Sequence, residues 1–357
     1  MNIKRITAFL RRCQKNRVYP IRVGVHQPNF PIPLSLRRYY DALRTPLMTL
    51  SVDLIPYTDA VAQAEPDWDL CWDPFCGWPM GPVWPRDAPK SLPRVITFHG
   101  AAPWTLGPEE FLGSTEGACA QEQQALILHR KEHWRQTAQT LRGVITPSRF
   151  GAIELAQNIA VPQARISPCP HGVDTRVFTP KGRSRSDVGF LHVSSPQPKK
   201  NIQRVIQAYR QLEDPGVPLT LIVPGWERTE EPDPRLHVVT EALPAEALAP
   251  YYRGATALIF PSLHETFGLP VAEAMACGCP VLSALGSALE ELYEGAALLV
   301  DPRSVTEISR GMQVLLQNEE QRASLHTRGL ERASHLTWEH SAQCHLAHFQ
   351  SLLSPIR

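Results

Sequence analysis

The sequence predicts an α/β protein built from two parallel-sheet domains. Short apolar runs rich in β-branched residues alternate with helical stretches, and the same plan appears in both halves of the chain. The length of 357 residues suits two domains at ~150 residues each. Because the alternation lacks hairpin signals, we expect parallel sheets covered on both faces. The carboxyl ends of the strands would then offer loops to a cleft between the two domains.

Composition excludes several other classes. The chain is 43% apolar and 20% charged, which is typical of a soluble globular protein. Lys+Arg 36 against Asp+Glu 35 gives a net charge of +1, so a dedicated nucleic-acid binder is not indicated. No apolar run approaches the ~20 residues of a membrane helix. The eight cysteines contain no pair of CxxC units, and no signal peptide is evident. We therefore expect a cytoplasmic protein with reduced thiols.

Residues 1–20 form a basic amphipathic segment. Apolar side chains at Ile3, Ile6 and Leu10 fall on one side of a helix over residues 2–15. Nine basic residues precede the first acidic one: Lys4, Arg5, Arg11, Arg12, Lys15, Arg17, Arg22, Arg37 and Arg38. Two interpretations are open. Residues 1–17 could contact the inner face of a membrane peripherally, or the apolar stripe could pack on the body of the protein.

The first domain is predicted over residues 21–175. A helix should begin at Ser35, a favourable N-cap, and another should cover residues 118–141. Ser148 should cap a further helix. The expected strands are 21–25, 49–55, 70–72, 94–98 and 143–146.

The second domain is predicted over residues 176–335, after a loop at 168–180. Residues 336–357 should form a helix that crosses back to the first domain. The expected strands are 188–193, 219–223, 237–239, 257–260, 280–283 and 297–300. The expected helices are 201–212, 245–252, 269–276, 305–318 and 319–335.

The most informative stretch is residues 264–281. After a strand that stops at Pro261, a loop carries Glu265, and a helix starts near Leu269 with Pro270 in its first turn. Helix N-termini offer unpaired N–H groups that suit a phosphate or a sugar oxygen. Glu265 and Glu273 could accept hydrogen bonds from hydroxyls at two points of one elongated ligand. The alternative is that both glutamates are charges on a solvated helix, although the apolar neighbours of Glu273 disfavour exposure.

This stretch of the sequence resembles glycosyltransferase family 4, the group-1 glycosyltransferases of GT-B fold. The spacing Glu265-x7-Glu273, with Phe-Gly-Leu-Pro between, resembles the EX7E signature of that family. Further stretches follow the family's order: His171–Asp174 with Phe178 and Pro180, Val193–Asn201, Ser287–Pro302, and Arg328–Ala333 ending at Trp338 and Glu339. The resemblance is strong over about residues 140–342 and weak before them. It implies two Rossmann-like domains that face each other across a cleft.

The resemblance also implies roles for individual residues. Glu265 would hold hydroxyls of the donor hexose, Glu273 the nucleotide ribose, and Lys200 the diphosphate, where negative charge grows as the leaving group departs. The donor set is Ser194, Ser195, Lys199, Lys200, Glu265, Thr266, Phe267, Gly268, Leu269 and Glu273. Members of the family transfer the sugar with retention and without a metal ion or other cofactor. The donor nucleotide, UDP or GDP, is left open.

The chain departs from the family pattern at the diphosphate and in the first domain. Ser194 stands where the family usually has Gly, and Ser195 where it often has Arg or Thr, so a second cation would come from Lys199 or from elsewhere. The glycine-rich loop after the first strand is replaced by residues 26–31. Residues expected on the acceptor side are His26, Asn29, Trp78 and Trp104.

His99, at the end of a first-domain strand, is the third predicted catalytic residue beside Glu265 and Lys200. It could contact the transferred sugar or position the acceptor, and a structural role is the alternative. Tryptophans at 68, 72, 78 and 84 could form an acceptor platform or could pack their own loop. The Asp67-Trp68-Asp69 triplet is interpreted as entry to a strand, so no metal site is predicted.

The resemblance thus implies a retaining, metal-independent hexosyltransferase that uses a nucleotide-diphosphate sugar and an unidentified acceptor. Two alternatives are kept. One is a nucleotide-sugar epimerase on the same architecture, which would change a donor without any acceptor. The other is a non-catalytic protein that binds nucleotide sugars.

Overall fold

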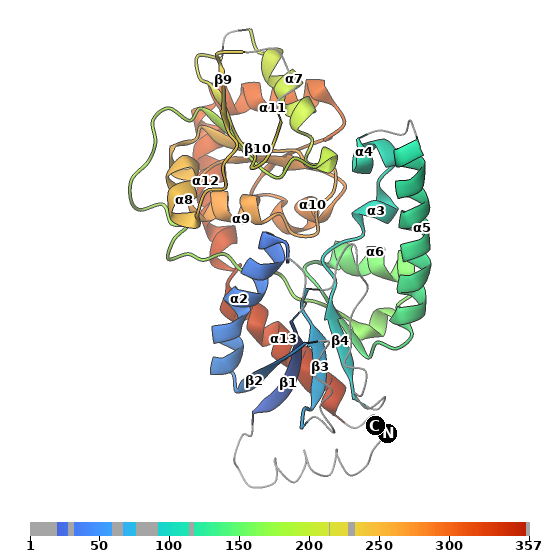
Figure 1. The fold of residues 1–357 in the computed structure, drawn as a ribbon. Helices are drawn as coiled ribbons and strands as arrows, with labels where there is room; N and C mark the ends of the chain where they lie inside the picture. Colours follow the sequence, from blue (N-terminus) through green and yellow to red (C-terminus); the bar gives the residue numbers. More distant parts are fainter. Residues whose placement is uncertain are drawn as a thin grey trace. The chain divides into compact units, whose positions relative to one another are not determined.

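A computed structural model describes residues 20–27, 32–58, 67–75, 92–113, 118–213, 215–227 and 233–354, without the side chains of residues 118–120 and 130. The basic segment, Asn29 and Trp78 lie outside the described residues. The chain divides into two compact units (Figure 1). Described residues within 1–101, 125–171 and 338–357 form the first unit, and those within 102–124 and 172–337 form the second.

The first unit is built on a parallel sheet. Its described strands follow the order β2-β1-β3-β4-β5-β6, and every neighbouring pair is parallel. Sequence analysis missed β6, because three residues with a terminal proline show too little periodicity. The strands are β1 (Ile21–His26), β2 (Val52–Tyr57), β3 (Leu70–Asp73), β4 (Arg94–Thr97), β5 (Gly143–Thr146) and β6 (Ile166–Pro168).

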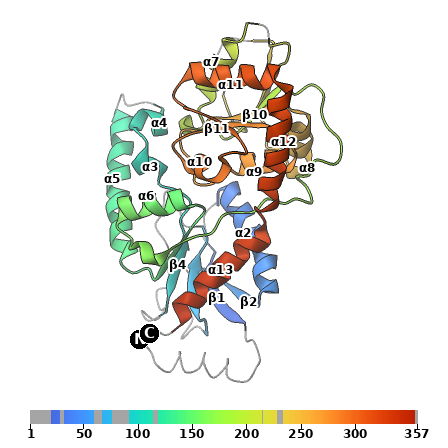
Figure 2. The same cartoon turned by 180° about the vertical axis from the view of Figure 1, so that it is seen from behind.

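Helices of the first unit cover this sheet. The last helix, α13, packs on α2, β5 and β6, and Figure 2 shows it lying across the sheet. Its Ala342 and Phe349 join a core with Tyr39, Leu43 and Trp72. The helices are α2 (Leu34–Thr49), α5 (Ala118–Ala138), whose first residues group with the second unit, α6 (Arg149–Ile159), the 3-10 turn η1 (Gln163–Arg165) and α13 (Trp338–Leu353).

Two boundary predictions in this unit were wrong, and one was confirmed. The N-cap of α2 is Pro33, which offers no side-chain acceptor, so Ser35 lies inside the helix. That helix continues to Thr49, and β2 therefore begins at Val52 and not at residue 49. The Ser148 Oγ accepts from the Gly151 N–H at 3.1 Å and caps α6 as predicted.

The second unit contains another parallel sheet. Its described strands follow the order β12-β11-β10-β7-β8-β9, all parallel, and each of the six was predicted. The α/β fold with two parallel sheets is thereby confirmed. The strands are β7 (Phe190–Val193), β8 (Leu219–Ile222), β9 (Leu236–Val239), β10 (Ala257–Phe260), β11 (Val281–Ala284) and β12 (Leu298–Val300).

The helices of the second unit bury amphipathic faces against this sheet. In α7, the side chains of Ile202, Val205, Ile206 and Tyr209 recur at helical spacing and are all buried. The short helices α3, α4 and α10 were not predicted, because one or two turns carry no readable periodicity. The elements are α3 (Ala102–Thr105), α4 (Pro108–Leu112), the 3-10 turn η2 (Pro198–Lys200), α7 (Ile202–Arg210), α8 (Ala245–Gly254), α9 (Leu269–Ala276), α10 (Ala288–Tyr293), α11 (Val305–Gln317) and α12 (Glu319–Ser334).

Among the helices that the structure describes, none combines the length and the apolar character needed to cross a bilayer.

Gly268 fixes how the chain enters α9. As the N-cap of α9 it has a φ of +81°, in the left-handed region that favours glycine. A Cβ at this position would lie 2.5 Å from Leu289 Cδ2, which is buried on α10. Only glycine therefore satisfies both the backbone conformation and the contact with α10.

We expect Gly268→Ala to lower the free energy of unfolding more than Gly216→Ala does. Both positions have positive φ, which costs alanine about 1 kcal/mol, but a Cβ at Gly216 meets no atom within 4 Å. The clash with Leu289 adds about 1–3 kcal/mol at Gly268. Urea denaturation measures both variants, and equal losses would contradict the proposed steric cost.

Candidate functional site

The candidate site lies at the carboxyl ends of β7 and β10, which are neighbours in the second sheet. The chain leaves β7 through residues 194–200 and leaves β10 through residues 261–268. The Lys199 carbonyl accepts from Leu263 N at 2.8 Å and from Ser262 Oγ at 3.0 Å. These two hydrogen bonds hold the loops together, as expected for loops that follow adjacent parallel strands.

Lys200 and Glu265 form an ion pair between these two loops. The Lys200 ammonium donates to Glu265 Oε1. The Ser262 hydroxyl, 2.9 Å from the same oxygen, shares its one proton between Oε1 and the Lys199 carbonyl. The pair is nearly enclosed, with 15% of the Lys200 side chain and 11% of the Glu265 side chain exposed. Both contacts use Oε1, and Glu265 Oε2 accepts no hydrogen bond from any described residue. The carboxylate is thus held in place by one oxygen while the other can accept from a ligand.

Nearby cations keep Glu265 ionised. Burial alone would raise the pKa of this carboxyl, but the charges of Lys200 and Lys199 and the hydrogen bonds from Lys200 and Ser262 outweigh it. The net result is a pKa below the ordinary value of 4.5. At neutral pH the site therefore presents a carboxylate beside two lysines.

His192 and Ser194 close one side of the site as a neutral pair. Burial lowers the pKa of His192 to about 4, so the ring is uncharged at neutral pH. Its Nδ1–H donates to the Ile259 carbonyl at 2.7 Å, which leaves Nε2 to accept from Ser194 Oγ at 2.8 Å. The hydroxyl proton of Ser194, a predicted donor-binding residue, is thus already engaged.

Asn201 fixes the position of Lys200. It has a φ of +66°, a conformation that Asn tolerates better than most residues. Its side-chain amide donates to the carbonyls of Pro261, at 2.8 Å, and Pro302, at 2.6 Å. One buried amide therefore connects the loops after β7, β10 and β12.

Glu273 lies one turn inside α9 and is 9% exposed, so the alternative of a solvated charge is wrong. Its Oε2 accepts from the Tyr252 hydroxyl at 2.9 Å. Burial raises the pKa of Tyr293, and the charges of both Glu265 and Glu273 raise it further, against a lowering by Arg332. Both carboxylates therefore act electrostatically on one buried hydroxyl, which donates to the Gly268 carbonyl at 3.4 Å.

The N-terminus of α9 adds backbone donors to this site. The N–H groups of Gly268 and Leu269 donate to no described residue. Phe267 is buried, and its ring meets that of Tyr293 edge-on at 6.3 Å. Thr266 is also buried, whereas Ser195 and Leu269 are half-buried. The predicted segment 265–269 thus combines a carboxylate with two unpaired amide protons.

In the first unit, His99 lies among aromatic rings. Its Nε2 is 2.8 Å from the Pro74 carbonyl and therefore carries the proton. Its ring centroid is 4.9 Å from Tyr39 and 5.8 Å from His171. Burial lowers the pKa of His99 to about 4. The imidazole is therefore neutral at pH 7.

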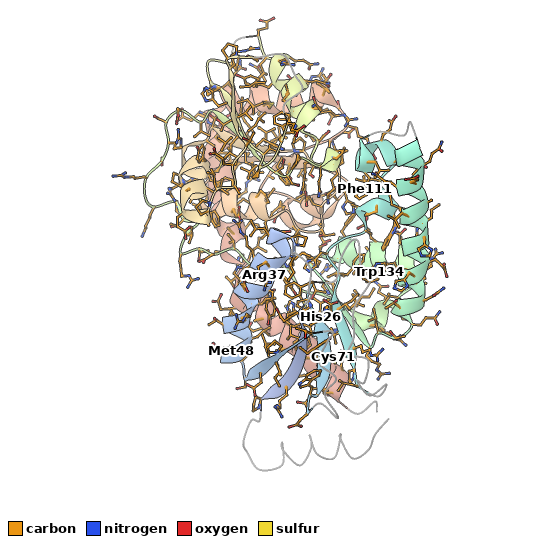
Figure 3. The ribbon with its side chains drawn as sticks, viewed as in Figure 1. His26, Arg37, Met48, Cys71, Phe111 and Trp134 are labelled. Carbon is orange, nitrogen blue, oxygen red and sulfur yellow. The ribbon has the colours of Figure 1, made fainter. Side chains whose placement is uncertain are left out.

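The structure describes two of the four residues that were predicted to lie on the acceptor side. His26, labelled in Figure 3 at the end of β1, is 2% exposed, and its Nδ1 lies 3.8 Å from Asp73 Oδ2. Trp104 is half-buried on α3, which groups with the second unit and not with the first. Asn29 and Trp78 lie outside the described residues.

The tryptophans at 68 and 72 are core residues, so these two form no acceptor platform. Trp68 stacks on Tyr57 at 5.1 Å between centroids, and Trp72 is fully buried. Asp69 Oδ2 accepts from the Arg22 N–H at 2.9 Å immediately before β3, which confirms that the Asp-Trp-Asp triplet is a strand entry. In the described ranges, no group of three or more His, Cys, Asp or Glu side chains could hold a metal ion.

Two family models match adjacent parts of the chain. The model described as "Glycosyltransferase Family 4" matches residues 8–177, and "Glycosyl transferases group 1" matches residues 178–332. The O-antigen chain mannosyltransferase B of Escherichia coli is 33% identical over 42% of this chain and 42% of its own length. The MMP alpha-(1->4)-mannosyltransferase of Mycolicibacterium hassiacum is 27% identical over 81% of this chain and 72% of its own.

Solved structures share the fold at low sequence identity. A sucrose-phosphate synthase from Thermosynechococcus elongatus superposes with a TM-score of 0.69 at 17% identity, covering 93% of this chain and 98% of that one. Anabaena Alr3699/HepE in complex with UDP and glucose gives 0.64 at 14% identity, covering 92% and 99%. The fold is therefore of the GT-B class. Together with the family models, it shows that this chain belongs to the group-1 glycosyltransferases, as its motifs predicted.

Several site residues had no role in the sequence analysis. Ser262 could have been found three residues before Glu265, and Asn201 stands inside the quoted Val193–Asn201 stretch. Tyr252 and Tyr293 come from α8 and α10, and only the tertiary fold brings their hydroxyls to α9 and its N-cap. No local spacing signals such long-range partners.

We expect the Lys200–Glu265 pair to show strong coupling in a double-mutant cycle. Lys200→Met leaves a buried carboxylate without its main partner and should cost about 3 kcal/mol. Lys200→Met combined with Glu265→Gln should cost less than the sum of the single changes. Urea denaturation at pH 7 measures all four proteins, and additive losses would contradict a direct ion pair.

The Lys200–Glu265 pair also predicts that the free energy of unfolding decreases at acid pH. Because the pKa of Glu265 is lower in the folded state, its contribution to stability is present above pH 4.5 and is lost as pH falls through the folded-state pKa. Between pH 5 and pH 3, Glu265→Gln should therefore lose less unfolding free energy than the wild type. Parallel pH dependences of the two proteins would contradict the assignment.

Proposed function

We propose that this chain transfers a hexose from a nucleotide-diphosphate sugar to an acceptor, with retention at the anomeric carbon and without a metal ion. One observation carries the proposal. Glu265 is an ionised carboxylate, anchored through Oε1 by Lys200 and Ser262, whose Oε2 can accept from a sugar hydroxyl. The N–H groups of Gly268 and Leu269, which donate to no described residue, lie three and four residues after Glu265 in the chain.

The leaving nucleotide requires positive charge at its diphosphate. An ammonium has three N–H donors, and Glu265 accepts only one of those of Lys200. The remaining donors can bond phosphate oxygens, whose negative charge grows as the glycosidic bond breaks. Lys199, whose charge also reaches Glu265, supplies the second cation in our proposal, since Ser195 stands where the family often has Arg or Thr.

The relatives favour a hexose donor. Both curated relatives described above are named mannosyltransferases, and the Anabaena protein was crystallised with UDP and glucose. We therefore propose mannose as the first sugar to test. The choice between GDP and UDP is decided by experiment, and Glu273 is proposed to hold the ribose.

His99 is proposed to contact the transferred sugar. Its Nε2 donates to the Pro74 carbonyl, which fixes the orientation of the imidazole ring. A neutral imidazole suits this role, because it adds no charge beside the reacting centre. The cytoplasmic location and the membrane contact of residues 1–17 stay predictions from sequence.

We expect Glu265→Gln to lower hexose transfer at least about 100-fold, the order lost when one charge-stabilising group is removed. Release of sugar from GDP-mannose, UDP-glucose and related donors measures activity, and thermal shift measures donor binding. Glu331→Gln, an exposed change on α12, is the control and should be fully active. Full activity of Glu265→Gln with any donor would overturn the assignment.

The same assay separates the alternatives. An epimerase would convert the donor sugar without acceptor, and chromatography of the products would reveal it. A binding protein would be stabilised by a donor but would show neither transfer nor slow donor hydrolysis.

Chelation tests the metal independence. Because lysines are proposed to neutralise the diphosphate, EDTA should leave the rate of transfer unchanged within about two-fold. An enzyme that needs a metal ion to stabilise the leaving diphosphate would instead lose most of its activity. Addition of Mg²⁺ or Mn²⁺ to the chelated enzyme is the matched control. A loss on chelation that either ion restores would contradict this part of the proposal.

A further inference from the structure

A pocket of about 350 Å³ lies within the second unit, between α4 and the start of α7. One wall comes from α4 and its C-cap, and the opposite wall from residues 196–197 after β7, η2, α7, Trp226 after β8 and Leu263 after β10. The lining residues are Glu109, Glu110, Gly113, Pro196, Gln197, Pro198, Asn201, Ile202, Gln203, Arg204, Trp226 and Leu263. None of the roles proposed above uses this pocket.

The walls of the pocket are held in place by polar contacts. Arg303 donates to both carboxylate oxygens of Glu110, at 2.7 and 3.0 Å, and so attaches α4 to the segment after β12. Arg204 donates to Asn201 Oδ1 at 2.9 Å. Gly113, with a φ of +82°, ends α4 against Pro198, where a Cβ would lie 3.1 Å from the proline ring. The pocket is therefore preformed.

The polar side chains that line it, of which Glu109, Gln197 and Gln203 are exposed, suit a neutral, hydroxyl-rich ligand. Among the described residues, the Glu109 carboxylate and the side-chain amides of Gln197 and Gln203 make no hydrogen bond, and neither does the Trp226 indole N–H. Carboxylates and amides accept from and donate to hydroxyls, and an indole face packs on the C–H face of a sugar ring. Of the two lining carboxylates, Glu110 is paired with Arg303, whereas Glu109 makes no ion pair with any described residue. An anion would thus meet an uncompensated Glu109.

The pocket adjoins the Lys200–Glu265 pair through shared loops. Pro198 lines the pocket and opens the 3-10 turn that ends at Lys200. Leu263 also lines it, and Glu265 follows two residues later. The pocket and the proposed donor site therefore use neighbouring residues of the same two segments, η2 and the loop after β10.

We propose that this pocket binds a neutral sugar unit of the acceptor, which makes the acceptor a saccharide; this rests on the proposed hexosyl transfer. Glu109 and Gln203 bond its hydroxyls, and Trp226 packs against its ring. The pocket thereby adds a specificity-determining site for the acceptor to the donor site at Glu265.

Binding is tested directly by saturation-transfer NMR on the full chain with α-linked mannotriose, uridine, guanosine and inorganic phosphate as separate probes. Mannotriose should bind the wild type, and Glu109→Ala with Gln203→Ala should weaken that binding at least five-fold. Gln207→Ala, an exposed glutamine one turn further along α7, is the matched control and should bind as the wild type does. Absence of mannotriose binding overturns the proposal, and so does a nucleoside or phosphate whose binding the pocket variants weaken instead.

Kinetics separates this proposal from the proposed function. The pocket variants should raise the KM for the saccharide acceptor at least five-fold while the KM for the donor and the rate of donor hydrolysis stay unchanged. An unchanged acceptor KM overturns the pocket assignment and leaves hexosyl transfer intact. A wild-type chain that neither binds nor hydrolyses any nucleotide sugar overturns the proposed function, and mannotriose binding still tests the pocket.

Discussion

The buried pair of Lys200 and Glu265 is the interaction on which the second unit's functional surface depends. It joins the loops that follow β7 and β10, and its formation keeps a largely enclosed carboxylate ionised. A lone buried charge would be costly, so the fold supplies a second lysine, a serine hydroxyl and a rigid asparagine around it. Relative to well-packed apolar side chains, buried ion pairs add little net stability, although removal of one partner alone is costly. Here the pair fixes where one carboxylate oxygen points.

The architecture explains why these residues meet. Parallel strands end at one edge of a sheet, so loops that are 65 residues apart in sequence become neighbours. Gly268 then turns the chain into α9, and the contact of α10 with this turn leaves no space for a larger side chain. The helix start and the carboxylate are thereby held in one short segment.

Much of the fold and part of the candidate site were predictable from the sequence, for reasons that differ from residue to residue. The six strands of the second sheet are short apolar runs that end at loop residues. Glu273 has apolar neighbours in the sequence, which predicted that it is buried. Contacts that join distant elements, such as Tyr252 with Glu273 or Arg303 with Glu110, leave no local signal. Helices of four to six residues, including α4, show no periodicity, so the pocket beside α4 was invisible in the sequence. Ser35 failed as a cap because the helix starts one residue before it.

The most direct test is a crystal structure of this chain with a non-hydrolysable analogue of its preferred nucleotide sugar. Our account predicts a hexose hydroxyl within hydrogen-bond distance of Glu265 Oε2 and the diphosphate against the Lys200 ammonium. A nucleotide sugar bound elsewhere, or one whose sugar turns away from Glu265, would contradict it.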